Sequence, residues 1–201
     1  MTAVWIKICG MTTPEAVAAA LDAGVDAIGF VFAESVRRVT PQIAAQLAAC
    51  ARGRVKLVAV TRHPSQSAVD EIVAVFRPDV LQTDAADLRT LTLPVELEKL
   101  PVLRGRQDAA SLPRRVLFEG LTSGSGIPCD WESAREGAQR TELILAGGLN
   151  PGNVAAAIAE VRPFGVDVSS GVEQRPGVKS PAEIARFAAA ARAAHFQEEM
   201  T

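Results

Sequence analysis

Short apolar runs rich in β-branched residues alternate along the chain with Ala-rich stretches that have the period of a helix. Most of these runs are continuously apolar, a pattern typical of parallel strands that are covered on both faces. The pattern predicts strands at about 4–9, 27–32, 55–60, 80–83, 100–104, 115–119, 142–146 and 165–169.

Helices are expected between these strands. Residues 13–24 begin with a Thr that can cap a helix, continue with a Pro in the first turn and end on a Gly, and residues 40–53 repeat this order. Further helices are predicted at 150–163 and 180–195, with two short ones near 85–91 and 107–112.

The alternation continues without a linker, so we expect a single domain over 1–201, with 197–201 as a frayed tail. Eight strand–helix units in about 200 residues predict an α/β fold of the (β/α)8 TIM-barrel type. An open doubly wound sheet is the alternative. A Rossmann sheet, however, would carry GxGxxG after its first strand, and "CGMTTP" does not supply it.

The composition, 48% hydrophobic and 22% charged residues, is that of a globular protein. A net charge of -2 without a basic cluster gives no electrostatic support for a nucleic-acid or membrane partner. Three cysteines without a CxxC pair, and two histidines, predict neither a disulfide framework nor a metal site. The chain shows no signal peptide and no long apolar run, so the expected compartment is the cytoplasm.

In a (β/α)8 barrel the chemical groups gather at the carboxyl ends of the strands. Gly147 and Gly148 follow the seventh predicted strand, and Ser169, Ser170 and Gly171 follow the eighth. Such small residues let backbone N–H groups approach an anion, and barrels commonly bind phosphate between these two loops. The alternative interpretation is a pair of tight turns that bind nothing.

Other polar side chains also follow strand ends. Cys9 ends the first strand, and either Arg37 or Arg38 after the second could form a forked pair with a carboxylate. Asp130 follows a Gly- and Ser-rich stretch and precedes Trp131. A carboxyl group beside an aromatic ring in a pocket can hold a proton for general acid catalysis, whereas in isolation Asp130 would cap the following helix.

Five segments carry a resemblance to a known family: "KICGMT", "DAIGFVFAESVRRVTP", "SGSGIPCDW", "LILAGGLNPGNV" and "FGVDVSSGVEQRPGVKS". In this order, from residue 7 to residue 180, the chain resembles the phosphoribosylanthranilate isomerases. The resemblance implies an isomerase of tryptophan biosynthesis that works without a cofactor. Its reaction converts N-(5-phosphoribosyl)anthranilate to 1-(2-carboxyphenylamino)-1-deoxyribulose 5-phosphate by an Amadori rearrangement.

The resemblance also implies residue roles. Cys9 would be the general base that removes the C2 proton, and Asp130 the general acid that opens the sugar ring. Arg37 would hold the anthranilate carboxylate. The phosphate loops fall on Gly147–Gly148 and Ser169–Ser170–Gly171.

Lys7 precedes Cys9 by two residues, so both side chains point to the same face of the strand. An ammonium group there would favour the thiolate form of the cysteine. The other two cysteines, Cys50 in an Ala-rich helix and Cys129 before Asp130, are expected to be small apolar filling residues.

The chain departs from the family around the substrate. The residue before Arg37 is unusual, which leaves Arg38 as a substitute for it. Thr83 stands where relatives have His, with Gln82 keeping a polar role, and Glu119 stands near an Asp position at the end of the sixth strand.

The expected ligand is a small phosphosugar, and the expected assembly is a monomer or a homodimer. Two alternatives remain open. One is a related aminoaldose isomerase of histidine biosynthesis, whose ligand has two phosphates and whose site typically has a carboxylate in place of Cys9. The other is a non-catalytic phosphosugar-binding barrel, which would need neither Cys9 nor Asp130.

Overall fold

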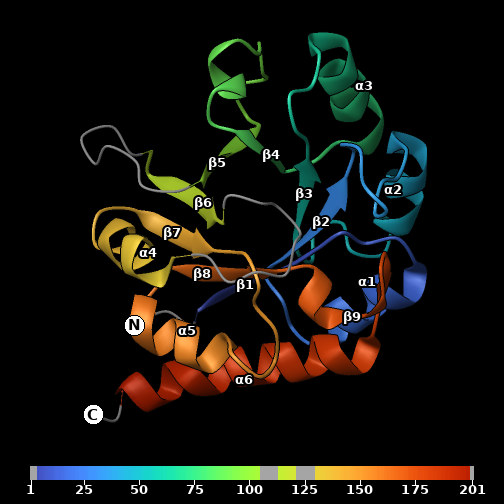
Figure 1. Cartoon of the computed structure of the whole chain (residues 1–201). Coiled ribbons are helices and arrows are strands. Elements are labelled where there is room, and N and C mark those ends of the chain that lie inside the picture. Colours follow the sequence, from blue (N-terminus) through green and yellow to red (C-terminus); the bar gives the residue numbers. More distant parts are fainter. Residues whose placement is uncertain (1–3, 105–112, 121–129, 200–201) are drawn as a thin grey trace.

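Eight parallel strands close into a barrel in the order in which they follow along the chain, and β8 pairs back onto β1 (Figure 1). The computed structural model describes residues 4–104, 113–120 and 130–199, and of 195–199 the backbone alone. The barrel strands are β1 (Trp5–Cys9), β2 (Ala27–Val31), β3 (Lys56–Val60), β4 (Val80–Asp84), β5 (Glu98–Arg104), β6 (Arg115–Glu119), β7 (Glu142–Leu145) and β8 (Gly165–Val168).

Helices lie around the barrel (Figure 1). Thr13 and Thr40 each cap a helix that has Pro in its first turn, as the sequence predicts. The α-helices are α1 (Pro14–Asp22), α2 (Pro41–Leu47), α3 (Gln66–Phe76), α4 (Trp131–Ala138), α5 (Val154–Val161) and α6 (Pro181–Glu199), and the short 3₁₀ helices are η1 (Asp87–Arg89) and η3 (Ser170–Val172). None of the described helices is long and apolar enough to cross a membrane.

The predicted (β/α)8 barrel and all eight of its strands are confirmed, with ends that differ by one or two residues. The predicted helix at 40–53 is wrong in length, because α2 ends at Leu47 and turns follow it. The helix expected near 85–91 is only the 3₁₀ turn η1, and 107–112 lies outside the described residues. Helix α6 continues into the expected tail as far as Glu199.

Two elements are additional to the predicted ones. Helix α3 is capped by Ser65 and buries Phe76 against the barrel. A small antiparallel hairpin, β9 (Glu173–Arg175) and β10 (Val178–Lys179), follows η3 after the last barrel strand.

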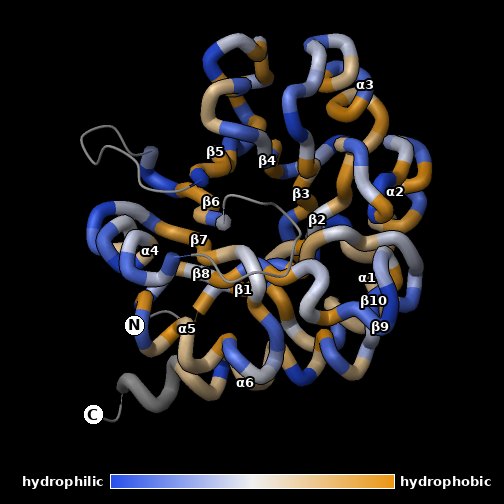
Figure 2. The backbone as a smooth tube through the Cα atoms, in the orientation of Figure 1, coloured by the Kyte–Doolittle hydropathy of each residue, from blue (hydrophilic) through white to orange (hydrophobic). Residues whose placement is uncertain are grey.

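The apolar core has two layers, because successive side chains of a strand point to opposite faces. The outer layer lies between the strands and the helices. Figure 2 shows hydrophobic residues concentrated along the barrel strands. The inner layer fills the barrel and consists of Ala27, Val58, Val80, Leu100, Val102, Leu117, Ile144 and Ala146. Residues two positions beyond these inner residues therefore point into the mouth of the barrel.

Candidate active site

A cavity of about 210 Å³ opens at the carboxyl ends of the strands, and all eight barrel strands or the segments after them contribute to its wall. Seven predicted site residues line it, namely Cys9, Arg37, Gln82, Gly147, Gly148, Ser169 and Ser170. Lys7 lies deeper in the barrel, and Gly171 lies behind the wall in η3. The structure thus brings together residues from both ends of the chain, as expected.

Cys9 lies at the end of β1, where its side chain is almost fully buried yet lines the cavity. Lys7 is 0% exposed on the same face of the strand, and its Nζ donates a hydrogen bond of 2.8 Å to Asp167 Oδ1. Burial lowers the pKa of Lys7, but the charges of Asp167 and Cys9 outweigh this effect and raise it. Lys7 is therefore a permanent cation beneath the thiol.

The expectation that Lys7 favours the thiolate form of Cys9 holds for the effect of Lys7 itself, because its charge and its hydrogen bond lower the pKa of the thiol. Burial raises the pKa of the Cys9 thiol, and the positive charge of Lys7 lowers it only in part. The negative charge of Asp167 acts in the same direction as burial. The net effect is a pKa of the Cys9 thiol above the ordinary value for cysteine.

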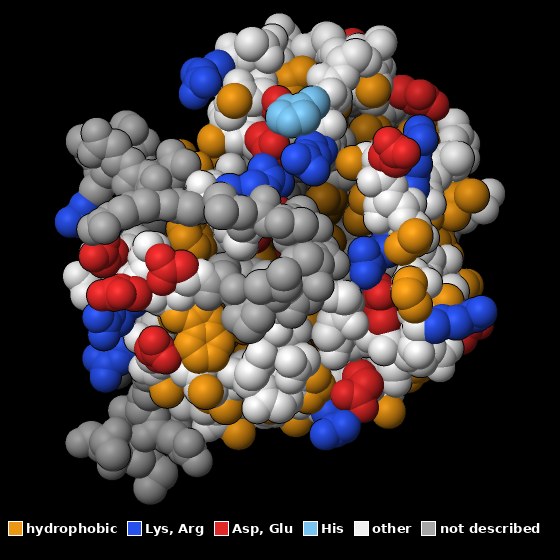
Figure 3. All heavy atoms as spheres, viewed as in Figure 1, with side chains coloured by type: hydrophobic (Ala, Val, Ile, Leu, Met, Phe, Trp, Pro, Cys, Tyr) orange, Lys and Arg blue, Asp and Glu red, His pale blue; other side chains and the backbone are white. Residues whose placement is uncertain are grey.

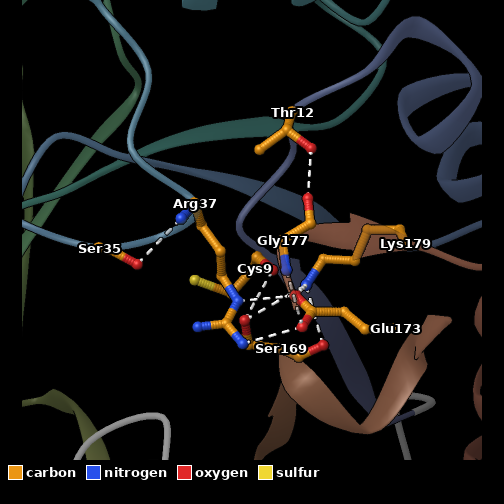
Figure 4. Close-up of polar contacts among 8 residues, drawn as sticks. All are labelled: Cys9, Thr12, Ser35, Arg37, Ser169, Glu173, Gly177 and Lys179. Atoms are coloured by element: carbon orange, nitrogen blue, oxygen red, sulfur yellow. Dashed lines mark hydrogen bonds and ion pairs between the residues drawn. The ribbon is translucent and has the colours of Figure 1, made fainter. Parts of the chain in front are cut away.

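Arg37 reaches from the loop after β2 to Glu173 at the start of β9 (Figure 4). Its Nε donates to Glu173 Oε1 at 2.6 Å and its Nη2 donates to Oε2 at 2.9 Å, a forked pair. These hydrogen bonds raise the pKa of Arg37. The neighbouring Arg38 is exposed and is not part of the cavity wall. Of the two arginines, the structure therefore places Arg37 at the site.

The loops after β7 and β8 form one side of the cavity. Gly147 and Gly148 have φ angles of 91° and 67°, the left-handed region that glycine tolerates best. Among the described residues, neither of their amide groups donates a backbone hydrogen bond. A Cβ added to Gly171 would lie 1.9 Å from the carbonyl oxygen of Leu149, so the two loops are in direct backbone contact. Because they donate no backbone hydrogen bond within the described part of the chain, the amide groups of Gly147 and Gly148 are suited to hold a phosphate.

A carboxylate also stands in the wall beside these loops, because β6 pairs with β7. Leu117 belongs to the inner layer of the barrel, so Glu119, two residues later at the end of β6, points into the mouth. Arg104 from the end of β5 donates from Nη2 to Glu119 Oε1 at 2.6 Å and also pairs with Asp84. Gln82 is buried in the same wall, and its Oε1 accepts no hydrogen bond from the described residues.

Asp130, the predicted general acid, lies outside the described cavity wall. It is exposed and caps helix α4, because its Oδ1 accepts hydrogen bonds from the amides of Glu132 and Ser133 at 3.1 and 3.3 Å. Its Oδ2 accepts a third, of 2.6 Å, from the Ser133 hydroxyl. The helix-cap interpretation is thus confirmed, whereas the acid role stays a prediction. The stretch 121–129 before it lies outside the described residues.

Thr83 does not supply a polar group to the cavity. It is fully buried on the face of β4 opposite to Gln82, and its Oγ1 donates to Asp87 Oδ2 at 2.7 Å. His63 from the preceding loop also contacts Asp87, with 3.0 Å between Nδ1 and Oδ1. Figure 3 shows a histidine with acidic and basic side chains beside it on this face of the molecule.

The remaining cysteines do not take part in the site. The expectation that Cys50 is a filling residue is wrong, because α2 ends three residues earlier and leaves Cys50 exposed. Cys129 lies outside the described residues.

The charged residues of the site that were not predicted include Asp167, Glu173, Arg104 and Lys179. For Asp167 and Arg104 the signal is present in the sequence, since each is a charged residue on the inward face of a barrel strand. Glu173 and Lys179 are part of a hairpin that no periodicity indicates, so the sequence gives no comparable signal for them.

This fold and this cavity are those of a (β/α)8-barrel enzyme. The model of one protein family, N-(5'-phosphoribosyl)anthranilate (PRA) isomerase, matches residues 6–190. The chain belongs to this family.

Curated relatives and solved structures agree with this assignment. The chain is 40% identical to the N-(5'-phosphoribosyl)anthranilate isomerase of Rhizobium rhizogenes, over 90% of this chain and 91% of that protein. It is 42% identical to the enzyme of that name from Rhizobium etli, over the same shares of the two chains.

Among solved structures, TrpF from Jonesia denitrificans is 34% identical, with a TM-score of 0.80 over 96% of this chain and 98% of that one. A phosphoribosylanthranilate isomerase in complex with reduced 1-(o-carboxyphenylamino)-1-deoxyribulose 5-phosphate is 28% identical. Its TM-score is 0.78, over 94% of this chain and 99% of that one.

Proposed function

We propose that this protein is a phosphoribosylanthranilate isomerase of tryptophan biosynthesis, converting N-(5-phosphoribosyl)anthranilate to 1-(2-carboxyphenylamino)-1-deoxyribulose 5-phosphate. The observation that carries the proposal is the position of Cys9, which shares one cavity with two glycine-containing loops and a carboxylate in a chain that matches this family over residues 6–190. The family match favours this substrate over the aminoaldose of histidine biosynthesis and over a barrel without activity.

The reaction needs an acid on one side of the sugar and a base on the other. Protonation of the ring oxygen breaks the C1–O bond and gives a Schiff base. Removal of the C2 proton then gives an enolamine, which becomes the ketone, so no atom is gained or lost. General acid and base groups typically contribute about 10²–10⁴-fold each to such steps.

Cys9 is the base in this proposal. Burial raises the pKa of its thiol, and the thiolate must form before Cys9 can accept the C2 proton. Lys7, a cation beneath it, supports that ionisation, because an ammonium group stabilises a thiolate.

For the acid we favour Glu119 over Asp130. Glu119 lines the cavity at the end of β6, while the carboxylate of Asp130 is occupied as a helix cap outside the wall. Arg104 binds both Glu119 and Asp84, and this positive charge favours the carboxylate form of Glu119, so Glu119 must take up a proton before it can act as the acid.

The two loops after β7 and β8 hold the phosphate, and Arg37 holds the anthranilate carboxylate. The amides of Gly147 and Gly148 and the nearby Ser169 and Ser170 support the first assignment. The second rests on Arg37 lining the same cavity next to Cys9. The partner is thus one small phosphosugar, and no cofactor takes part.

The assembly is a monomer or a homodimer, and the compartment is the cytoplasm. The related Thermotoga maritima isomerase is described as dimeric, with monomers generated from it. Sedimentation of the purified protein distinguishes the two states.

The test is an assay in which the protein is mixed with freshly prepared phosphoribosylanthranilate and the loss of its fluorescence is followed. We expect turnover by the unmodified chain and at least a 10²-fold lower kcat for Cys9→Ala. Cys50→Ala is the matched control, because it removes an exposed thiol outside the cavity and should leave kcat unchanged. No turnover by the unmodified chain would overturn the proposal.

A further inference from the structure

Glu173 is a buried carboxylate at the centre of three contacts behind the cavity wall (Figure 4). Its side chain is 5% exposed and binds Arg37 through both oxygens. Its Oε1 also accepts a hydrogen bond of 2.8 Å from Lys179 Nζ, and its Oε2 accepts one of 3.2 Å from the amide of Gly177. Two positive side chains and a backbone donor therefore fix this carboxylate in one place.

The pairing leaves a defined part of the Arg37 guanidinium for a ligand. A guanidinium has five N–H groups and two edges that can each hold a carboxylate. Glu173 occupies the edge formed by Nε and Nη2. The other edge, which carries Nη1, points away from Glu173 in Figure 4. Since Arg37 also lines the cavity, this second edge is the one available to a bound carboxylate.

The backbone amide and the aliphatic part of Arg37 are held as well. Its amide donates to Ser35 Oγ at 3.1 Å, and its Cδ crosses Gly10 so closely that a Cβ there would lie 2.7 Å from it. The guanidinium itself, however, is fixed by Glu173 alone among the hydrogen bonds of the described residues. A flexible arginine loses rotational freedom on binding, so a partner that holds it in advance lowers that cost.

We infer that Glu173 is a positioning residue, which sets the orientation of Arg37 and thereby makes the site selective for a sugar phosphate that carries an aromatic carboxylate. Glu173 does not touch the ligand in this scheme. The inference rests on the proposed function, because it assumes that the ligand carboxylate meets Arg37.

Glu173→Gln tests this role, since glutamine keeps the shape but offers one acceptor and a donor that faces two other donors. The substitution should leave binding of the ligand phosphate unchanged, because Lys179 also donates to the backbone carbonyl and the hydroxyl of Ser169, at 2.9 and 3.3 Å. Two ligands are titrated calorimetrically. One is the reduced product, 1-(o-carboxyphenylamino)-1-deoxyribulose 5-phosphate with its ketone reduced, and the other is the same compound without the aromatic carboxylate.

We expect Glu173→Gln to weaken binding of the first ligand by about 10-fold or more and of the second by less than about 2-fold. Arg37→Ala should give the same selective loss, and Glu173→Gln should add little to it in the double variant, as expected for a residue that acts through another. Glu183→Gln, which removes a carboxylate paired with Arg186 on the surface, is the control and should change neither affinity. Turnover should show a raised KM with a smaller change in kcat.

Equal weakening of both ligands, or additive losses in the double variant, would overturn the inference and leave Glu173 a structural residue. Glu173→Asp keeps the charge and replaces the Gln variant if that variant does not fold. We expect it to lose part of the selectivity between the two ligands. An equal loss of affinity for both ligands would count against the inference. Failure of the unmodified chain to turn over phosphoribosylanthranilate would instead overturn the proposed function. The two failures are therefore distinguishable.

Discussion

In the proposed mechanism Cys9 is the base, and a thiol can accept a proton from carbon only after it has lost its own proton. The surroundings of Cys9 would then decide when the enzyme is active. Burial raises the pKa of this thiol, and Lys7 offsets the effect only in part. The base form therefore becomes more populated as pH rises above neutrality. An enzyme limited by this ionisation gains activity on the alkaline side.

We expect kcat/KM of the unmodified protein to rise with pH above 7, by about tenfold per pH unit where the thiol is still protonated. A Cys9→Asp variant, whose carboxylate ionises near pH 4 in water, should lose this alkaline rise and keep some activity at neutral pH. Steady-state rates from pH 6 to about 9.5 measure both profiles. An alkaline rise that persists in the variant would assign the titration to another group.

The two candidate acids also differ at the level of single residues. Glu119→Gln should lower kcat by about 10²-fold or more, because it removes an ionisable group from the cavity, and should also lower the thermal midpoint, because Arg104 loses a paired carboxylate. Asp130→Asn should instead leave kcat within a few-fold and cost at most about 1 kcal/mol of stability, as a helix cap does. Parallel kinetics and thermal melts separate the two effects, and the opposite pattern would return the acid role to Asp130.

The sequence predicts some of these residues better than others. Cys9 and the glycine loops follow strand ends, so the barrel rule alone places them at one cavity. The position of Asp130 also follows a predicted strand, but the sequence cannot show that its carboxylate is used by the next helix. The inward direction of Glu119 follows from the two-residue alternation of β6 once Leu117 is known to lie inside the barrel.

At the scale of elements, the phosphate site depends on the contact between the loops after β7 and β8. Gly171→Ala would place a methyl group 1.9 Å from the carbonyl oxygen of Leu149, a distance that forces one loop to move. We expect this variant to lose at least about 2 kcal/mol of stability, as overpacked sites do, and to bind inorganic phosphate more weakly. Chemical denaturation and phosphate titration measure the two effects.

Gly53→Ala is the control for that variant. Gly53 has a φ of 77° and nothing within 4 Å of an added Cβ, so the cost is that of the left-handed backbone, about 1–2 kcal/mol, and phosphate affinity should not change. A Gly171→Ala protein that binds phosphate normally would show that the loop contact does not shape the site.

Strands were predictable as elements because each is a continuous apolar run, and their order followed from the alternation with helices. The β9–β10 hairpin was not, because its strands, "EQR" and "VK", are short and largely polar. That hairpin forms through tertiary contacts instead. Its Glu173 and Lys179 make buried pairs, and Gly177 accepts a hydrogen bond of 2.8 Å from the Thr12 hydroxyl near the start of the chain.

At the scale of the whole molecule, closure of the barrel joins segments that are far apart in the sequence. The pair of Lys7 and Asp167 spans 160 positions, and that of Arg37 and Glu173 spans 136. Periodicity reports only local structure, so no pattern in the sequence could reveal these partners. The same long-range pairs make the fold sensitive to their charge state.

The charge state of Glu173 determines the direction in which stability changes with pH. Burial raises the pKa of its carboxyl group, but the hydrogen bonds from Arg37 and Lys179 outweigh this effect and lower it below the ordinary value. A carboxyl group with a lowered pKa in the folded state contributes stability that is present above its unfolded pKa, near 4.3, and lost as pH falls through the folded value. The contribution of Glu173 to the free energy of unfolding should therefore be constant from pH 7 to about 5 and decline below about pH 4.

Urea denaturation between pH 7 and 3 measures this decline. Glu173→Gln should be less stable than the unmodified protein at pH 7, because Arg37 and the buried Lys179 lose their shared anion. Its stability should fall less steeply with acid, so that the difference between the two proteins narrows as pH decreases. Glu142→Gln is the comparison, since its ion pairs with Arg115 lie on partly exposed side chains and should contribute about 1 kcal/mol or less. If the difference for Glu173→Gln stayed constant down to pH 3, ionisation of this carboxylate would not be what ties the hairpin to the barrel.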